Sequence, residues 1–371
     1  MGAASASASM RAAVKRLSFG KAEERRHAAT EVARLARSDE RTKRLLPELG
    51  VVPPLVSMLA DDAGARMAAA EALLELARGT HRNKVHIVKA GLLKKLPRLM
   101  DDKDLSRSQH LALLLLSISS LANTDFPLSS SELLPFLVTT LIADDVPADT
   151  KLPCLAALRN LSTKLEHVRD VVSSGAVHAL LALSLHDEKT SEAALSILGE
   201  LAATSAAGKK AVEEDETAPR ALVDAMTRHE NPRCQEHAAY LVMVVLAHGH
   251  GSRALRENMR GLGVVQALLE VTLLGSPLAQ RRAAKILQWF KDDGQGRMRA
   301  HSGPRMEGAS LGSDVAGGSG ESEDCRNAVD KIVKQSLDRN MKSILRRATA
   351  SVDLTNVKLL VTSSSSKSLP C

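Results

Sequence analysis

One short phrase recurs six times along the 371-residue chain: a glycine or turn residue, two small apolar residues, and then a leucine-rich stretch. Examples are "GLLKKLPRLM" at 91–100 and "GAVHALLALS" at 175–184. The shared leucine lies at Leu55, Leu96, Leu137, Leu180, Leu222 and Leu268, in steps of 41, 41, 43, 42 and 46 residues. A fixed period of this length is typical of a repeat protein.

A second phrase has the same period. It reads as a helix with small residues early and a large apolar residue late, and its last core position lies at Leu35, Leu76, Leu121, Leu161, Leu201, Leu246 and Phe290. A short polar helix is expected between the phrases, so each unit is a short helix followed by two longer ones. One unit cannot bury its own apolar face, and only stacked units close a core. The expected fold is therefore an all-α superhelix with a long groove.

Two residue types support this stacking. Gly91, Gly175 and Gly263 fit tight turns into the second helix, where a Cβ atom would be costly. Small residues recur at one equivalent position of the third helix, which lets neighbouring helices approach closely: Ala69, Cys154, Ala194, Ala239 and Ala283.

The composition narrows the functional classes. Aromatic residues make up only 2% of the chain, which is too few for stacking bases. The net charge of +7 is concentrated at the two ends, while residues 51–250 are mildly acidic. We therefore expect no nucleic-acid partner. The four cysteines are far apart, and Cys154 and Cys234 lie in helical patterns, which favours buried reduced thiols and a cytoplasmic or nuclear location.

No catalytic or cofactor-binding motif occurs in the sequence. Cys234 and His237 could share a metal ion, but four ligands at a known spacing are not assembled. We expect no enzymatic activity, no cofactor and no metal.

The phrases "CLAALRNLS", "ILGELA", "LLELA" and "RRAAKILQWF", together with the spacing, resemble armadillo repeats, and specifically the armadillo region of plant U-box-type proteins. The resemblance covers about residues 21–293. It implies a right-handed α-solenoid whose groove, lined by third helices, binds an extended peptide or a partner helix. The residues before the first repeat are too few for a U-box, so we expect no ubiquitin ligase activity from this chain alone.

Aligning the repeats on their last core residue predicts two rows that face the groove. The first row reads Arg34, Glu75, Ser120, Asn160, Glu200, Val245 and Trp289. The second, one helical turn earlier, reads Thr30, Glu71, Leu116, Ala156, Ser196, Leu241 and Lys285. Importin-α-type armadillo proteins carry mostly Asn and Trp in these rows, so the single Asn160 disfavours a nuclear-import receptor.

Seven residues of these rows are the predicted partner-binding candidates: Arg34, Glu71, Glu75, Asn160, Glu200, Lys285 and Trp289. Their charges predict a partner that is basic or polar in its centre, with Asn160 bonded to the partner's backbone. The alternative is that they are solvated charges on helix surfaces. Trp289 fits either a binding hot spot or a core residue that closes the last repeat.

We expect five segments along the chain. Residues 1–20 form a disordered N-terminus, 21–293 the armadillo-repeat solenoid, 294–322 a flexible linker, 323–350 a basic amphipathic helix, and 351–371 a disordered tail. Residues 324–347 could cap the solenoid, bind a partner helix or lie on an anionic membrane. Ser18 and Thr349 follow basic residues and are candidate phosphorylation sites.

Together these features predict a non-enzymatic scaffold or adaptor. One alternative is the substrate-recognition component of a ubiquitin ligase whose catalytic domain is on another chain. A second is a peripheral membrane protein, held at the plasma membrane by the basic C-terminal helix. The sequence leaves the oligomeric state open.

Overall fold

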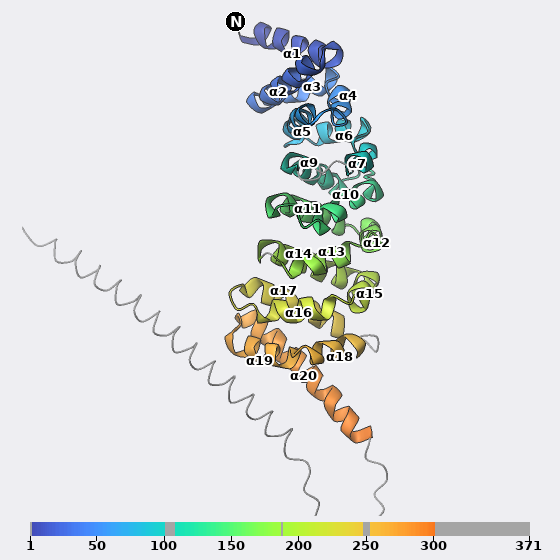
Figure 1. Ribbon diagram of the computed structural model, residues 1–371, viewed down its shortest axis with the longest axis vertical. Coiled ribbons are helices and arrows are strands. Elements are labelled where there is room, and N and C mark those ends of the chain that lie inside the picture. The colour runs from blue at the N-terminus through green and yellow to red at the C-terminus, as the bar shows by residue number, and fades with distance from the viewer. Residues whose placement is uncertain (1, 101–107, 187, 248–252, 301–371) are drawn as a thin grey trace, which may run out of the picture. The chain divides into compact units, whose positions relative to one another are not determined.

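The computed structural model describes residues 2–100, 108–186, 188–247 and 253–300, and all regular elements in these ranges are helices (Figure 1). The chain divides into two units, residues 1–265 and residues 266–371.

The first unit is built from three kinds of helix that alternate along the chain. The third helices of successive repeats are α2 (Ala22–Ser38), α5 (Ala63–Ala77), α9 (Gln109–Ser119), α11 (Ala148–Ser162), α14 (Glu188–Thr204) and α17 (Pro232–Leu246). The second helices are α4 (Val52–Met58), α7 (Leu92–Met100), α10 (Ser130–Ile142), α13 (Ala176–Ser184) and α16 (Ala218–Thr227). The first helices are α3 (Glu40–Glu48), α6 (His81–Lys89), α12 (Leu165–Ser173), α15 (Ala206–Glu214) and α18 (Arg253–Gly261).

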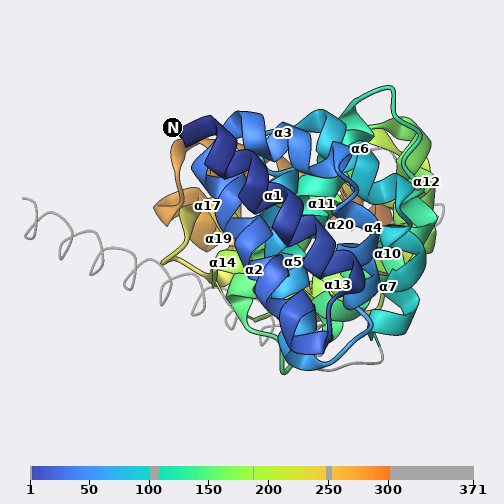
Figure 2. The same cartoon turned by 90° about the horizontal axis from the view of Figure 1, so that it is seen from above.

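Helices of one kind stack on each other through this unit. Each third helix contacts the next, from α2 through to α17, and second helices do the same from α7 to α16. Figure 1 shows the third helices following one another along one side of the column, and Figure 2 shows the same stack from its N-terminal end. The predicted all-α armadillo solenoid is therefore confirmed.

Local sequence signals set where these helices begin. The side chains of Asp62 and Asn231 accept hydrogen bonds from backbone N–H groups in the first turns of α5 and α17. Gly91 and Gly175, just before α7 and α13, have φ values of 89° and 82°. An L-residue with a side chain rarely adopts this left-handed conformation, which explains why glycine recurs there.

Small residues at the contact between third helices are fully buried, as predicted. Ala69, Cys154, Ala194 and Ala239 are all inaccessible to solvent. Cys154 and Cys234 are buried, as predicted, and neither is in a disulfide in the structure. Burial raises the pKa of the Cys154 thiol to about 12, and burial also raises the pKa of the Cys234 thiol.

The expectation of a disordered N-terminus was wrong. Residues 2–19 form α1 (Gly2–Phe19), which packs against α2 and contacts α4. Ala13 and Leu17 lie on one side of this helix and are completely buried, while Phe19 is 86% exposed. The stretch is rich in alanine, the strongest helix former, and the inward-facing Ala13 and Leu17 anchor the helix on its neighbours.

Two further boundaries differ from the expectation. The expected short first helix between α9 and α10 is missing. A 3₁₀ turn (Ser120–Asn123) and irregular chain connect these two helices instead. In the second unit α20 (Pro277–Ala300) continues past residue 294, where the linker was expected to begin. The helix α19 (Val264–Leu274) crosses the boundary between the two units. The predictions for residues 301–371, including Thr349 and the amphipathic helix at 324–347, lie outside the described residues.

Candidate functional site

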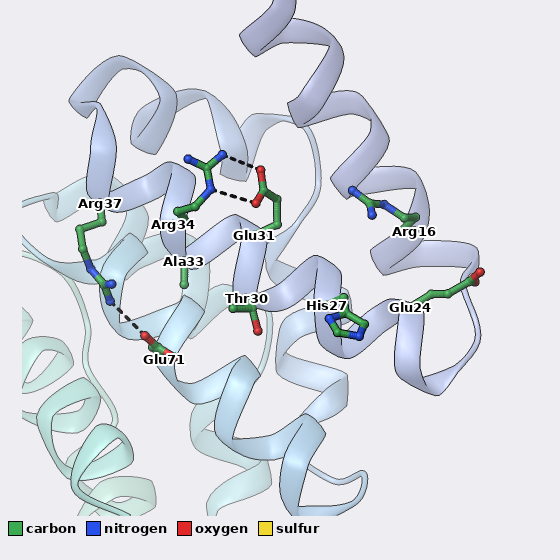
Figure 3. Close-up of a pocket in the computed structure, with 9 residues that line it drawn as sticks. All are labelled: Arg16, Glu24, His27, Thr30, Glu31, Ala33, Arg34, Arg37 and Glu71. Carbon is green, nitrogen blue, oxygen red and sulfur yellow. Dashed lines mark hydrogen bonds and ion pairs between the residues drawn. The ribbon is translucent and has the colours of Figure 1, made fainter.

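The exposed and half-exposed side chains of α2, α5, α9, α11, α14 and α17 form one surface of the first unit, which we call the third-helix face. Two clefts open on it. The first, the N-terminal cleft, has a volume of about 770 Å³ and lies between α1, α2 and α5 (Figure 3). Its lining residues are Arg16, Glu24, His27, Thr30, Glu31, Ala33, Arg34, Arg37 and Glu71.

Ion pairs organise the charges of the N-terminal cleft. Arg34 donates from Nε and Nη2 to the two carboxylate oxygens of Glu31, at 3.0 and 2.7 Å. These hydrogen bonds lower the pKa of Glu31 and raise that of Arg34. Arg37 bonds Glu71 of the next repeat at 3.0 Å, and this contact raises the pKa of Arg37. Figure 3 shows both pairs, and Arg16 of α1 on the opposite wall of the cleft.

The second cleft, the central cleft, has a volume of about 440 Å³ and lies between α11, α14 and α17. Its lining residues are Arg159, Lys189, Glu192, Ala193, Ser196, Arg233 and His237. Arg159 pairs with Glu200 at 2.6 Å, and Arg233 pairs with Glu192 at 3.2 Å. Each pair therefore joins a third helix to its neighbour.

The predicted residues Arg34 and Glu71 both line the N-terminal cleft. Glu75 was predicted to contact a partner, and its burial corrects this prediction. Its side chain is only 7% exposed and bonds Arg37 at 3.2 Å and Arg78 at 3.0 Å. Arg37 and Arg78 cover this carboxylate, so Glu75 acts by holding these two arginines.

Asn160 and Glu200, the other two candidates in the first unit, also have partners within the protein. The Asn160 amide donates a hydrogen bond to the Ser119 hydroxyl at 2.9 Å. Asn160 therefore links α11 to α9, and its side chain is half-exposed. The Glu200 carboxylate is held by Arg159. Since Glu71, Glu75 and Glu200 are all paired with arginine, the acidic character that predicted a basic partner is largely neutralised.

The candidates Lys285 and Trp289 lie one turn apart on α20 in the second unit. The Lys285 ammonium sits 5.7 Å from the centre of the Trp289 ring, within the range of a cation–π contact. Trp289 is half-exposed, so it is not a core residue that closes the last repeat.

The predicted rows are out of register on α17. Leu241 and Val245 are completely buried, while Tyr240 and Val244 are half-exposed. The Tyr240 ring lies against Gly199 of α14, where a Cβ atom would come within 3.0 Å of it. Leu246 is buried as predicted, but Val245 beside it is buried as well, so the exposed row of α17 begins one position earlier, a rotation of about 100°.

Sequence reasoning missed the arginines and the lysine that give the face its positive groups. Arg37, Arg159 and Arg233 each reach a carboxylate on the neighbouring third helix, and Lys189 lines the central cleft together with Arg159 and Arg233. A signal was available: the partners of Arg159 and Arg233 are each 41 residues away, one repeat along the chain. The other predicted modification site, Ser18, is exposed near the end of α1.

Within the described residues, no group of three or more His, Cys, Asp or Glu side chains could hold a metal ion. None of the helices there has the length and apolar character needed to cross a membrane.

Comparison with known proteins decides the family. A family model described as the plant U-box protein ARM repeat region matches residues 9–299. The chain belongs to this family. The armadillo match thus starts inside α1, which agrees with the packing of that helix on the first repeat.

Two Arabidopsis thaliana proteins illustrate the relationship. U-box domain-containing protein 45 is 27% identical over 266 residues, which cover 70% of this armadillo chain and 33% of that protein. U-box domain-containing protein 7 is 28% identical over 185 residues, which cover 48% of this chain and 23% of that protein. The armadillo chain therefore spans a third or less of the length of these relatives.

Solved structures support the same fold. An engineered protein superposes with a TM-score of 0.57 at 21% identity, covering 74% of this chain and 66% of that one. A computationally designed armadillo repeat protein for modular peptide recognition gives a TM-score of 0.53 at 24% identity, covering 62% of this chain and 98% of that one. A designed armadillo repeat protein in complex with the peptide (KR)4 gives 0.52 at 21% identity, covering 63% and 98%.

Proposed function

We propose that the chain is a non-enzymatic scaffold or adaptor that binds an extended peptide or a helix of a partner protein on its third-helix face. The observation that carries this proposal is that both clefts of this face are built by side chains from successive repeats. A segment lying along the stack would meet a new set of polar groups at each repeat. Designed armadillo proteins of similar fold, one of them holding the peptide (KR)4, support this mode of binding.

The proposal excludes a uniformly basic partner such as that peptide. The carboxylates Glu71, Glu75 and Glu200 are all paired with arginines of this chain, so they offer little net negative charge to a ligand. The partner segment is expected to be polar and mixed in charge, and to be positioned by hydrogen bonds and ion pairs over several repeats.

The test compares two substitutions to arginine on different faces. Ala156→Arg places a long charged side chain on the third-helix face of α11, where Ala156 is half-exposed. Leu165→Arg places the same side chain on α12, where Leu165 is 73% exposed. Partners identified by affinity capture are purified, and their dissociation constants are measured with both variants. Binding weakened about tenfold by Ala156→Arg alone supports the proposal. Equal binding to both variants contradicts it.

A second candidate function comes from the relatives. Both Arabidopsis relatives are named as U-box domain-containing proteins, and this supports a role as the substrate-recognition component of a ubiquitin ligase whose catalytic domain is on another chain. A ubiquitylation assay with purified components tests this: a recognition component increases modification of its bound partner by an added ligase, and a simple scaffold does not.

A further inference from the structure

The two clefts of the third-helix face differ in net charge. The N-terminal cleft is lined by the three arginines Arg16, Arg34 and Arg37 and by three glutamates, Glu24, Glu31 and Glu71, so its charges cancel. The central cleft is lined by three cationic side chains, Arg159, Lys189 and Arg233, but by only one carboxylate, Glu192. Glu200, which pairs with Arg159 beside the cleft, is a second carboxylate, so the group as a whole carries a net charge of +1 with His237 neutral.

The cations of the central cleft are positioned by their neighbours. Arg159 comes from α11 and is held by Glu200, while Arg233 comes from α17 and is held by Glu192. Each of these carboxylates engages one guanidinium nitrogen, which leaves further N–H donors for a ligand. The two arginines belong to the helices on either side of α14, which carries Lys189.

All three cations are exposed, but Lys189 differs from the two arginines in its contacts. It makes no ion pair or side-chain hydrogen bond with the residues that the structure describes. It also lies in the first turn of α14, as Arg233 does in α17, where the helix dipole favours a bound anion. The small residues Ala193 and Ser196 complete the lining of this cleft of about 440 Å³.

We propose that the central cleft binds a phosphorylated serine or threonine side chain of the partner segment. This inference rests on the proposed function and specifies the chemistry recognised at one position of the face. A phosphate group carries about −1.5 to −2 charges at neutral pH, and its three acceptor oxygens match the Lys189 ammonium and the N–H donors of Arg159 and Arg233 that their carboxylates do not engage. A carboxylate has only two acceptor oxygens and would leave one of these three side chains without a bond.

The experiment uses the full chain and three pools of short fluorescein-labelled peptides. The pools share randomised flanking positions and carry phosphoserine, serine or glutamate at the centre. Fluorescence anisotropy measures binding to each pool. The phosphoserine pool is expected to bind about tenfold more tightly than the other two, and its affinity should fall as salt concentration rises. Equal binding of phosphoserine and glutamate, or no binding of any pool, overturns the proposal.

Substitutions locate the contact. Lys189→Glu reverses the charge of an exposed side chain that has no ion pair among the described residues, so the fold is retained. It is expected to lower affinity for the phosphoserine pool at least about tenfold. The matched control Lys94→Glu reverses the charge of an exposed lysine on the second helix α7, outside the third-helix face, and is expected to leave that affinity unchanged. Phosphoserine binding that is insensitive to Lys189→Glu contradicts the assignment to the central cleft.

The two sets of variants also distinguish a failure of the phosphate proposal from a failure of the proposed peptide-binding function on which it rests. If Ala156→Arg abolishes binding of all pools equally and phosphorylation has no effect, the third-helix face binds peptides but the phosphate assignment is wrong. If phosphoserine binding depends on Lys189 but Ala156→Arg does not change the affinity for the purified partners, the cleft recognises phosphate. In that case the proposed binding of partner segments along the third-helix face is wrong.

Discussion

At the scale of single residues, burial decides how much each ion pair of the third-helix face contributes. The Glu75 side chain is 7% exposed and is shared by two arginines, whereas the Glu200 side chain is 37% exposed and has one. A hydrogen bond between charged groups away from water is stronger than an exposed ion pair, which competes with solvent and salt. Of these two glutamates, Glu75 is therefore the one whose ion pairs stabilise the fold.

Neutralising these two carboxylates should have different consequences. We expect Glu75→Gln to lower the free energy of unfolding by about 1–2 kcal/mol, because two guanidinium contacts are weakened in a buried place. The matched variant Glu200→Gln should lower it by less than about 0.5 kcal/mol. Urea titrations followed by circular dichroism measure both values. Equal losses would show that burial does not distinguish the two pairs.

At the scale of elements, α1 covers the N-terminal edge of the repeat stack. A solenoid needs such a terminal element, because the outer surface of its first repeat would otherwise expose apolar side chains. α1 fulfils this with Met10, Ala13 and Leu17, which face inward, and it also supplies Arg16 to the wall of the N-terminal cleft. The same helix therefore contributes both to stability and to the candidate binding surface.

Two truncations on α1 test this role. Leu17 is completely buried, so Leu17→Ala should destabilise the N-terminal repeat by about 2–4 kcal/mol and increase amide hydrogen exchange in α1 and α2. Phe19, two residues later, is 86% exposed, and Phe19→Ala should change stability by no more than about 0.5 kcal/mol. Exchange in α2 that is unchanged by Leu17→Ala would mean that α1 does not cover it.

At the scale of the whole first unit, contacts between repeats follow the sequence period. The pairs Asn160–Ser119, Arg159–Glu200 and Arg233–Glu192 each join residues 41 positions apart. Each third helix contacts only its neighbours in the series of third helices, so the unit behaves as a one-dimensional array in which stability is the sum of repeats and their interfaces. A local change should therefore remain local.

Overpacking one interface tests this. Ala194 is completely buried on α14, so Ala194→Leu forces extra carbon atoms between third helices and should cost about 1–3 kcal/mol. Hydrogen exchange should increase in α11, α14 and α17, while α2 and α5 keep their protection. Ala193→Leu, at the half-exposed neighbouring position, is the control and should change little. Uniform loss of protection in all repeats would contradict the one-dimensional description.

The sequence by itself determined the repeat architecture. The helices and their stacking were predicted from local and periodic signals. These signals are a period near 42 residues in two registers, the small residues at 69, 154, 194 and 239, and the glycines before second helices, which the structure shows with positive φ. The residues of the third-helix face were predicted in part: Arg34, Glu71 and Asn160 lie on it as expected. Wherever the helix phase held, counting along the chain was sufficient.

Only the tertiary structure decided which charges remain available to a partner. Glu75 and Glu200 are paired with arginines of adjacent helices, the α17 row is displaced to Tyr240 and Val244, and Lys189 lies in a cleft between two arginines. These facts depend on the rotation of each helix about its axis and on the reach of long side chains between repeats. A rotation of one residue is about 100° on a helix, and the sequence pattern does not fix it to that accuracy, because several residues of similar size can occupy the last core position.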